Sequence, residues 1–514
     1  MPITMCGVPT TPATKPPTAG PRASFTAVTF LLLLLLTVAA VLVHGYHPEV
    51  EDAEIYLPGI KKALNPNLYP YNQAFFASHA HLTFFPNLIA ASVRFSHVPL
   101  DYALLAWHLL SIFLLLLACW RVGRLCFASQ RARWGGVVMV AALLTIPVAG
   151  TSLYVMDQYL NTRSLSTPML LLAIVNAVEH RWMRVGLWLG LTALIHPLMV
   201  VFGFAYVVLV IALERREKLS TAACLFLPFG LFPPVSDAYR EILNTRSYFF
   251  LLRWEWYEWL GIFGPIALLW WYRRLARSHD LPGLRLMSST LILFELLFFA
   301  AALVLTIPPR FANLAELQPM RALHLVYILL SAFGGGLLAE FVLRDKIWRW
   351  LPLFLPLCLG MWYAQRQLFP ATSHLELPWT RTRNDWVSAF LWIRHNTPPD
   401  AYFALDPKHM GLPGEDQHGF RAVAERSMLA DALKDSGAAS MFPQLAEEWK
   451  RQVRAEEGWN SFQLADFQKL RRQFGVDWVA LEHPVAGMEC PYRNSTVLVC
   501  RIPTANPPPA AGHS

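Results

Sequence analysis

Residues 25–56 read FTAVTFLLLLLLTVAAVLVHGYHPEVEDAEIY, an apolar run followed by a cluster of acids. The run Phe25–Val43 has 19 residues, close to the roughly 20 that an α-helix needs to cross a bilayer. The apolar core of a secretory signal is shorter, about 7–15 residues, so we interpret this run as an uncleaved signal anchor. Four carboxylates follow it within six residues: Glu49, Glu51, Asp52 and Glu54. Like charges at this spacing oppose one another's ionisation unless a cation lies among them, so the cluster is the first candidate site.

The composition of the whole chain is typical of a membrane protein. Of its 514 residues, 55% are hydrophobic and 15% are charged, and the mean hydropathy is +0.36. Soluble domains carry about 25% charged residues. Roughly half of the Asp and Glu residues follow residue 370, which leaves the preceding part very poor in acids. The net charge of +8 does not indicate nucleic-acid binding, because the excess Arg residues lie in short loops between apolar runs.

Eleven apolar runs predict membrane spans. They are residues 24–43, 101–119, 135–149, 164–178, 185–195, 198–213, 220–236, 258–272, 286–307, 320–341 and 350–367. Alternate loops hold basic clusters, and the positive-inside rule places these loops in the cytoplasm. The 44–100 loop and everything after residue 370 are then outside. We therefore expect a polytopic α-helical membrane protein of about 11 spans, with a cytoplasmic N-terminus and a small extracytoplasmic C-terminal α/β domain.

The domain organisation follows from the same changes in composition. Residues 1–23 are rich in Pro and Thr and are predicted to be a disordered cytoplasmic tail. Residues 24–369 form the transmembrane domain, which includes the outer loop 44–100. Residues 370–502 form the soluble α/β domain, and residues 503–514 are a second disordered tail.

The segment 82–98 does not fit a simple count of spans. It is apolar but contains Pro86 and Arg94, and a crossing there would invert every later loop. We interpret the outer loop instead as two helices on the outer face, at about 53–63 and about 82–97.

The segment 185–213 does not fit a simple count of membrane spans either. This run is too long for one straight crossing and short for two. Basic clusters at both of its ends favour a broken pair of helices that turns at His196-Pro197, where proline supplies the break.

The residues after 370 are predicted to alternate short strands with helices. Helices are expected at 386–395, 425–436, 441–457 and 467–474, and strands at 401–405, 478–481 and 496–502. Cys490 and Cys500 flank a short segment near the end of the chain. Outside the cytoplasm they would close a hairpin with a disulfide, and the alternative is two unpaired buried cysteines.

The acidic cluster can support chemistry. On a helix or on an extended strand, two of its carboxylates can converge on one ligand. One carboxylate can then serve as a general base toward an acceptor hydroxyl, and a pair can hold a divalent metal. The alternative is a solvated acidic helix start, which the helix dipole favours.

Other polar residues are predicted at the same outer face. Three arginines there oppose the positive-inside rule: Arg163, Arg310 and Arg321. An anionic lipid headgroup or a pyrophosphate would account for them, and ion pairs with nearby acids are the alternative. His79 and His81 either ligate a metal or contact a phosphate, or they are ordinary interfacial histidines. His196 either caps the carbonyls freed at the helix break or reaches the site.

These features resemble the GT-C superfamily of membrane glycosyltransferases. An N-terminal span, an outer loop that opens with an acidic motif, many further spans and a soluble outer C-terminal domain carry the resemblance. Several segments also resemble a bacterial polytopic family of that architecture. They are His47–Tyr56 (HPEVEDAEIY), Leu64–Pro70 (LNPNLYP), His196–Leu198 (HPL), Trp392–Ala401 (WIRHNTPPDA), Gly419–Arg421 (GFR) and Glu425–Ser427 (ERS).

The resemblance implies an inverting glycosyltransferase of the bacterial inner membrane. Such an enzyme moves a sugar from a polyprenyl-phosphate donor to an envelope acceptor on the outer face. The resemblance further implies that Asp52 is the catalytic base, that Glu51 assists it, and that outer-face arginines hold the lipid phosphate. The C-terminal part lacks a Trp-Trp-Asp-Tyr-Gly motif, which disfavours protein acceptor peptides.

A metal cofactor is part of the same expectation. Candidate ligands of a divalent metal, Mg²⁺ or Mn²⁺, are Glu49, Asp52 and Glu54. The chain has Glu-Asp with flanking glutamates rather than a plain Asp-x-Asp, so metal dependence stays open.

Two other classes of function remain open. A transporter or flippase would bind its substrate near the middle of the membrane between broken helices, where Glu295 is the main ionisable residue. A non-enzymatic envelope scaffold would bind a partner through its soluble domain, and its acidic loop would be inert.

Overall fold

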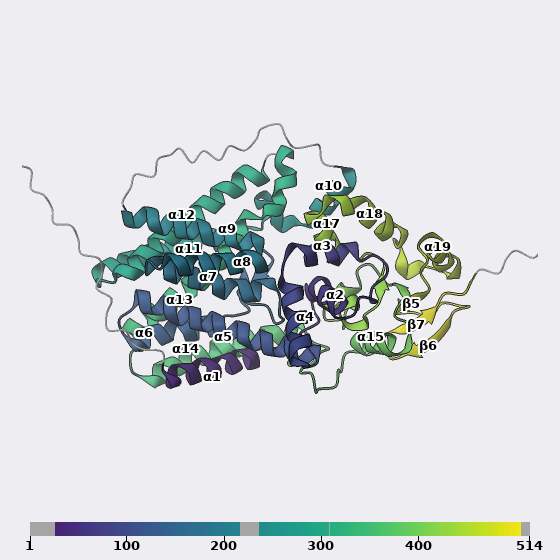
Figure 1. Ribbon diagram of the computed structural model, residues 1–514, viewed down its shortest axis with the longest axis horizontal. Helices are drawn as coiled ribbons and strands as arrows, with labels where there is room; N and C mark the ends of the chain where they lie inside the picture. The colour runs from purple at the N-terminus through teal and green to yellow at the C-terminus, as the bar shows by residue number, and fades with distance from the viewer. Residues whose placement is uncertain (1–25, 216–235, 308, 505–514) are drawn as a thin grey trace, which may run out of the picture.

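The computed structural model describes residues 26–215, 236–307 and 309–504. It consists of a bundle of long helices and a smaller C-terminal unit, residues 385–504, which contains a sheet (Figure 1). The helices of the outer loop lie between the bundle and this unit in Figure 1. The polar C-terminal unit and the apolar bundle therefore meet across the loop that carries the acidic cluster.

The bundle consists of the long helices before residue 369. They are α1 (Ala27–His44), α5 (Leu100–Cys126), α6 (Gln130–Ala142), α7 (Thr162–Val178), α8 (Trp182–Ile195), α9 (Pro197–Arg215), α11 (Trp256–Ser278), α12 (Pro282–Thr306), α13 (Leu323–Leu338) and α14 (Ile347–Leu368). In the described ranges, five stretches are long and apolar enough to cross a membrane: Ala27–His44, Leu100–Cys126, Pro197–Glu214, Pro282–Thr306 and Asn313–Leu343. The span predicted at 220–236 falls almost wholly outside the described residues. The chain is a helical membrane protein, and the number of 11 spans stays a prediction.

Small residues allow one close crossing in the bundle, between α6 and α13. Gly135 faces Ala339 and Gly335, and a Cβ atom built on Gly135 would lie 2.6 Å from the carbonyl oxygen of Gly335. Small residues let helix backbones approach in a membrane, where the hydrophobic effect does not drive helices together. This packing fixes α13 and with it the turn that precedes α13 at the end of the bundle.

The outer loop forms three helices: α2 (Ala53–Leu64), α3 (Ala74–Leu82) and α4 (Phe85–Ser96). The helices predicted at 53–63 and 82–97 are confirmed. The third helix, α3, was not predicted, because its sequence AFFASHAHL has no continuous polar face that would reveal a helical period.

The predicted break within 185–213 is confirmed. α8 ends at Ile195 and α9 begins at Pro197. Proline is tolerated at the first position of a helix, where its missing N–H has no intrahelical acceptor. His196 connects the two helices with an extended backbone, at φ −152°.

Short elements fill the end of the bundle that faces the C-terminal unit. They are β1 (Pro147–Val148), β2 (Leu153–Tyr154), α10 (Asp237–Thr245) and the 3₁₀ turns η1 (Ser247–Phe249), η2 (Leu251–Arg253), η3 (Pro309–Leu317) and η4 (Pro319–Ala322). β1 and β2 pair in an antiparallel hairpin.

The C-terminal unit is built on a five-stranded sheet with the strand order β4-β3-β5-β7-β6. Its strands are β3 (Tyr402–Ala404), β4 (Ser427–Met428), β5 (Trp478–Leu481), β6 (Glu489–Arg493) and β7 (Leu498–Arg501). β3 runs parallel to β4 and β5, and β7 runs antiparallel to β5 and β6. The three predicted strands are present and β6 is an addition. Cys490 on β6 and Cys500 on β7 form a disulfide.

The helices of this unit are α15 (Asp385–Asn396), α16 (Phe420–Ala424), α17 (Asp435–Met441), α18 (Ala446–Ala455) and α19 (Leu464–Phe474). The helix predicted at 425–436 is wrong. Glu425 adopts the left-handed conformation, with φ +55°, and ends α16. The next residues join the sheet as β4, and the Asp431 carboxylate accepts the N–H of Leu433 at 2.7 Å ahead of α17. Local side-chain bonds to the backbone compete with a continuous helix at this place.

The acidic motif is docked on the C-terminal unit through its backbone. Val50 forms an antiparallel bridge with His418. The N–H of Gly419 donates to the carbonyl of Glu49 at 2.9 Å, and the N–H of Glu51 donates to the carbonyl of Gln417 at 2.8 Å. Residues 49–51 therefore behave as a short strand on the edge of the C-terminal unit.

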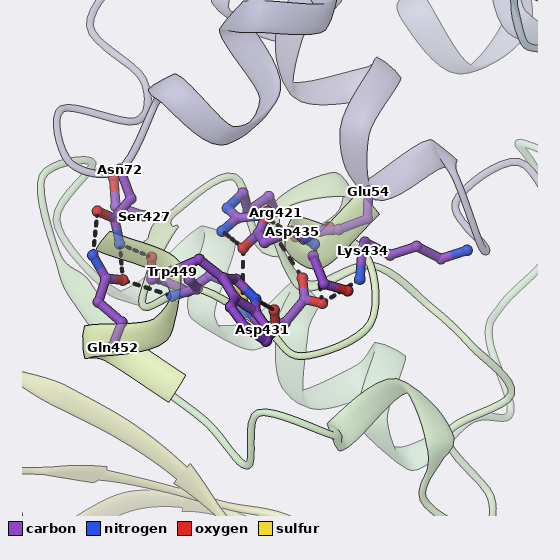
Figure 2. Close-up of polar contacts among 12 residues, drawn as sticks. Glu54, Asn72, Arg421, Ser427, Asp431, Lys434, Asp435, Trp449 and Gln452 are labelled. Carbon is purple, nitrogen blue, oxygen red and sulfur yellow. Dashed lines mark hydrogen bonds and ion pairs between the residues drawn. The ribbon is translucent and has the colours of Figure 1, made fainter. Parts of the chain in front are cut away.

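Arg421 lies fully buried between acids from both parts of the chain, as Figure 2 shows. It donates to Oδ1 and Oδ2 of Asp435 at 3.0 and 2.6 Å and to Oε1 of Glu54 at 3.2 Å. Oε2 of Glu54 accepts the N–H of Ala422 at 3.0 Å. A Cβ atom on Gly419 would collide with that carboxylate, so this position has room only for glycine. Glu54 is therefore a docking residue.

A second buried cluster joins the start of the outer loop to the segment after α14. Glu376 accepts from Nδ1 of His47 at 2.8 Å and from Nε2 of His418 at 3.1 Å. Burial opposes both charges, but the attraction between them and their hydrogen bonds lower the pKa of Glu376 to about 2 and raise the pKa of His418 to about 10. The carboxylate therefore holds together three segments that are distant in sequence.

The Arg421 cluster generates a prediction about stability. We expect Arg421→Met to destabilise the protein by about 3–5 kcal/mol, because it leaves buried acids without their cation. Glu54→Gln is the matched variant: burial raises the pKa of Glu54 to about 8 despite Arg421, so an amide removes little charge. Thermal unfolding of the purified protein in detergent should give a clearly lower midpoint for Arg421→Met than for Glu54→Gln. Equal losses in the two variants would contradict the explanation.

The Glu376 cluster generates a prediction about pH. The contribution of Glu376 to stability is complete above its ordinary pKa of 4.5 and is lost as the pH falls toward 2. The contribution of His418 is complete below its ordinary pKa of 6.5 and is lost as the pH rises toward 10. Proteolysis of residues 369–384 should therefore be slowest between pH 4.5 and 6.5. In wild type the rate of proteolysis should rise as the pH increases toward 10, and His418→Gln should remove this rise. A wild-type rate of proteolysis that stays constant up to pH 10 would refute the proposed role of the His418–Glu376 pair.

Candidate functional site

A cavity of about 970 Å³ lies where the bundle helices end at the C-terminal unit. Its wall includes residues from the outer loop, from the segment before α7, from the α8–α9 turn, from η1, from η4 and from α17. Those that matter below are Glu51, Asp52, His79, Asp157, Arg163, His196, Leu198, Val201, Arg321 and Lys434. The cavity thus collects residues that the sequence analysis placed on separate outer loops.

The wall of the cavity has an apolar side. Pro147 and Val148 of β1 and Leu198 and Val201 of α9 form it. α9 is one of the stretches that are apolar enough to cross a membrane. The apolar side of the cavity therefore continues onto a helix that would face lipid.

Glu51 and Asp52 lie on the polar side and share one cation. Nζ of Lys434 donates to Oε2 of Glu51 and, at 3.1 Å, to Oδ1 of Asp52. Glu51 has φ +56°, in the left-handed region, and this turn connects the docked strand to α2. The Asp52 side chain is 38% exposed, and within the described residues its Oδ2 has no hydrogen-bond partner. One oxygen of Asp52 is therefore free to meet a ligand.

The charges around Asp52 keep it ionised. Burial alone would raise its pKa, but Lys434, with Arg163 and Arg321 farther away, holds the pKa of Asp52 well below its usual range. The backbone N–H of Asp52 donates to the phenol oxygen of Tyr159 at 3.3 Å, which helps to orient the residue. Asp52 is a carboxylate over the whole physiological pH range.

Arg163 faces the cavity from the first turn of α7. Its Nη2 donates to Oδ2 of Asp157 at 2.7 Å, and Nδ2 of Asn161 donates to the same oxygen at 2.6 Å. Asn161 also caps α7 by accepting the N–H of Ser164 at 3.0 Å. A capped helix N-terminus beside an arginine favours an anion, because the helix dipole and the guanidinium act in the same direction.

Arg321 faces the same cavity from η4. Its side chain makes no ion pair or hydrogen bond within the described parts of the chain, and its Nε is buried without an acceptor. Arg321 as a whole is half-buried, but a buried N–H without an acceptor is costly unless a ligand satisfies it. Arg321 is therefore the cation best prepared to bind an anion in this cavity.

The other residues singled out from the sequence are placed differently. His79 and His196 line the cavity, whereas His81 is exposed and does not. Nε2 of His79 lies 3.2 Å from Sδ of Met441, and burial lowers the pKa of His79 to about 4, so the ring is neutral. The side chain of Arg310 lies outside what the structure describes.

The three carboxylates grouped as candidate metal ligands have separate partners, which corrects that grouping. Oε1 of Glu49 is 3.6 Å from Nζ of Lys61, Asp52 contacts Lys434, and Glu54 contacts Arg421. Asp52 precedes α2 and lines the cavity, whereas Glu54 lies in the first turn of α2 and is fully buried against Arg421. Within the described residues, no group of three His, Cys, Asp or Glu side chains converges as a metal site. Glu49, Asp52 and Glu54 therefore do not form one three-ligand site in the described structure.

Sequence reasoning missed Lys434. It lies in the stretch Asp431–Asp435 (DALKD), which has no motif and no clear period. The only signal was indirect: four crowded acids in the first loop require a cation, but no pattern tells which Lys or Arg supplies it.

Thirteen chains of solved structures are similar to this chain. No family model and no curated protein matches the sequence. The chain is similar to the structure of the archaeal oligosaccharyltransferase AglB from Archaeoglobus fulgidus in complex with an inhibitory peptide and a dolichol-phosphate. The sequence identity is 13%, the match covers 88% of this chain and 69% of that chain, and the TM-score is 0.43.

Proposed function

We propose that the chain is an inverting glycosyltransferase that moves a sugar from a polyprenyl-phosphate donor to an acceptor hydroxyl at the outer face of the membrane. One observation supports this most directly: Asp52, Arg163 and Arg321 face a single cavity at the end of the membrane helices. Transfer of a sugar from a lipid phosphate requires a base for the acceptor and cations for the leaving group.

Asp52 is the proposed base. The oxygen of the acceptor hydroxyl attacks the anomeric carbon of the donor sugar on the face opposite the phosphate. The new C–O bond forms as the C–O bond to phosphate breaks, and the phosphate leaves with the bonding electrons. Oδ2 of Asp52, which Lys434 does not contact, takes the hydroxyl proton. Attack from the opposite face inverts the anomeric carbon.

The arginines are proposed to hold the leaving phosphate. Arg321 has unused donors, and Arg163 stands at the N-terminus of α7. Charge-assisted hydrogen bonds from guanidinium groups to phosphate are among the strong ones in proteins. Negative charge grows on the phosphate as its bond to the sugar breaks, so fixed cations there favour the transition state more than the ground state.

The apolar side of the cavity is proposed to receive the polyprenyl chain. Leu198 and Val201 lie on α9, which is apolar enough to cross a membrane. A lipid that approaches along this helix would bring its phosphate toward Arg163 and Arg321 while its chain stays in contact with apolar side chains. The acceptor would then enter beside the C-terminal unit, whose α17 forms the opposite wall.

The transporter alternative has weaker support. Glu295 is buried in α12, and within the described residues neither of its carboxylate oxygens has a hydrogen-bond partner. It does not line the cavity, which lies at the end of the bundle rather than at its middle. One isolated acid does not make a transport path, which requires a series of polar groups.

Asp52→Asn tests the proposed base and separates an enzyme from a scaffold. In a strain that lacks the gene, wild-type protein should restore the missing envelope glycan, and the variant should restore less than about 1% of it, because loss of a general base costs about 10²–10⁴ in rate. Mass spectrometry of envelope glycans measures this. Asp101→Asn is the control, since Asp101 is an exposed acid outside the cavity. Equal restoration by wild type and by Asp52→Asn would end the proposal that Asp52 is catalytic.

Arg321→Gln tests the proposed phosphate site. We expect it to weaken binding of polyprenyl phosphate by about 10- to 100-fold, the equivalent of one charged hydrogen bond worth about 1.5–3 kcal/mol. No acid loses an ion-pair partner in this variant, whereas Arg163→Gln would also leave Asp157 unpaired. Titration of purified protein in nanodiscs with polyprenyl phosphate, followed by Trp fluorescence, gives the affinity.

The matched control for that titration is Arg253→Gln. Arg253 is exposed, donates to Asn244 at 2.9 Å and does not line the cavity. Its substitution should leave the affinity unchanged. If Arg321→Gln binds polyprenyl phosphate as tightly as wild type, the phosphate lies elsewhere.

A further inference from the structure

The ammonium group of Lys434 lies between two of the carboxylates that line the cavity, Glu51 and Asp52. It contacts Oε2 of Glu51 and, at 3.1 Å, Oδ1 of Asp52, and its side chain is 16% exposed. Both acids belong to the outer loop, whereas the lysine belongs to the C-terminal unit. In Figure 2, Lys434 extends away from the Arg421 cluster.

The backbone that carries Lys434 is held on both sides. Oδ1 of Asp431 accepts the N–H groups of Leu433, at 2.7 Å, and of Lys434. The next residue, Asp435, forms the ion pair with Arg421. Lys434 therefore extends from a turn that the buried cluster fixes, and its charge reaches the same place whenever the C-terminal unit is docked.

A divalent metal would compete with Lys434 for this place. Mg²⁺ takes oxygen ligands at about 2.0–2.1 Å and usually binds through one or two carboxylates. Of the four acids in the first-loop cluster, Glu51 and Asp52 are the two available here, because Glu49 pairs with Lys61 and Glu54 with Arg421. An ammonium group among these oxygens uses their lone pairs and repels a dication at short range.

We propose that Lys434 is a tethered cation that takes the place of a divalent metal, so that Glu51 and Asp52 work without one. Lys434 is a positioning residue: it acts through Asp52, holding one carboxylate oxygen while the other faces the cavity. The statement about catalysis rests on the proposed function, whereas the exclusion of metal concerns only the acid pair and Lys434.

The site is assembled from two parts of the chain. The cation comes from the C-terminal unit and the acids come from the outer loop. The acid pair is therefore neutralised only when the two parts are docked, in contrast to a site that a free metal ion could complete.

Binding of Mn²⁺ to the full-length protein in nanodiscs tests the exclusion directly. Loss of the free-ion signal in electron paramagnetic resonance, measured during titration with MnCl₂, reports bound metal. Wild type should show no binding that depends on Asp52. Lys434→Ala should gain a site at least about tenfold tighter than any in wild type, because a positive charge a few ångströms away is removed. The double variant Lys434→Ala/Asp52→Asn should lose the gained site.

Three further variants complete the test. Lys450→Ala is the matched control, since Lys450 is a partly buried lysine of the same unit that pairs with Glu241 at 3.1 Å and does not line the cavity; it should gain no Asp52-dependent site. Lys434→Arg should still exclude Mn²⁺. Lys434→Met keeps most of the side-chain volume and replaces Lys434→Ala if the alanine variant does not fold.

Two results would overturn the proposal: Mn²⁺ binding by wild type that Asp52→Asn removes, or no gain of binding in Lys434→Ala or, where that variant does not fold, in Lys434→Met. A separate measurement addresses catalysis, where wild type should keep its full activity in excess EDTA. If no transferase activity exists at all, the proposed function fails, and the Mn²⁺ titration still decides whether Lys434 excludes a metal.

Discussion

The buried guanidinium of Arg421 is the interaction on which the arrangement of the site depends. A buried cation must be paired, and its partners, Asp435 and Glu54, come from the C-terminal unit and from the outer loop. Once Glu54 is held there, the residues just before it have little freedom. The strand 49–51 lies along residues 417–419, and the turn at Glu51 brings the carboxylates of Glu51 and Asp52 to the cavity. The residues of the acidic motif therefore have two roles. Glu54 docks the outer loop on the C-terminal unit, and Glu51 and Asp52 face the cavity.

The cavity holds both an ionised carboxylate and cations that can bind an anion. Asp52 is balanced by Lys434, and Arg163 is balanced by Asp157. Arg321 has no partner among the described residues, so the cavity can attract an anion while it keeps an ionised carboxylate nearby. In a partly buried site with low local dielectric, each of these interactions is stronger than it would be in water. Without other partners, the Asp52 carboxylate and the Arg163 guanidinium would attract each other. The ion pairs Asp52–Lys434 and Arg163–Asp157 keep these two side chains in separate contacts.

The features predicted correctly from the sequence are local ones. The apolar helix at Phe25–Val43, the helix at 53–63 and the break at His196-Pro197 follow from a few neighbouring residues. Lys434 could not be found in this way, because its role depends on acids that are far from it in the chain. The metal grouping failed for a related reason: spacing showed that four acids were close in sequence, but not that Glu49 and Glu54 had cations elsewhere. The helix predicted at 425–436 failed because Glu425 and Asp431 stop it through backbone conformation and capping.

The segments that resemble a bacterial membrane family take on a different meaning once they are placed in the structure. Gly419 and Arg421 of the GFR segment touch Glu54, and the hydroxyl of Tyr69, in the LNPNLYP segment, donates to the carbonyl of Arg421 at 2.9 Å. Glu425 of the ERS segment pairs with Lys61 of α2 at 3.0 Å. These short motifs therefore specify how the outer loop docks on the C-terminal unit. Two other segments, HPEVEDAEIY and HPL, do line the cavity, through residues such as Asp52 and His196, whereas Arg321 and Lys434 lie outside all of these segments. A chain that keeps the docking motifs but lacks these two cations would preserve the architecture and lose the charges on which the proposed chemistry depends.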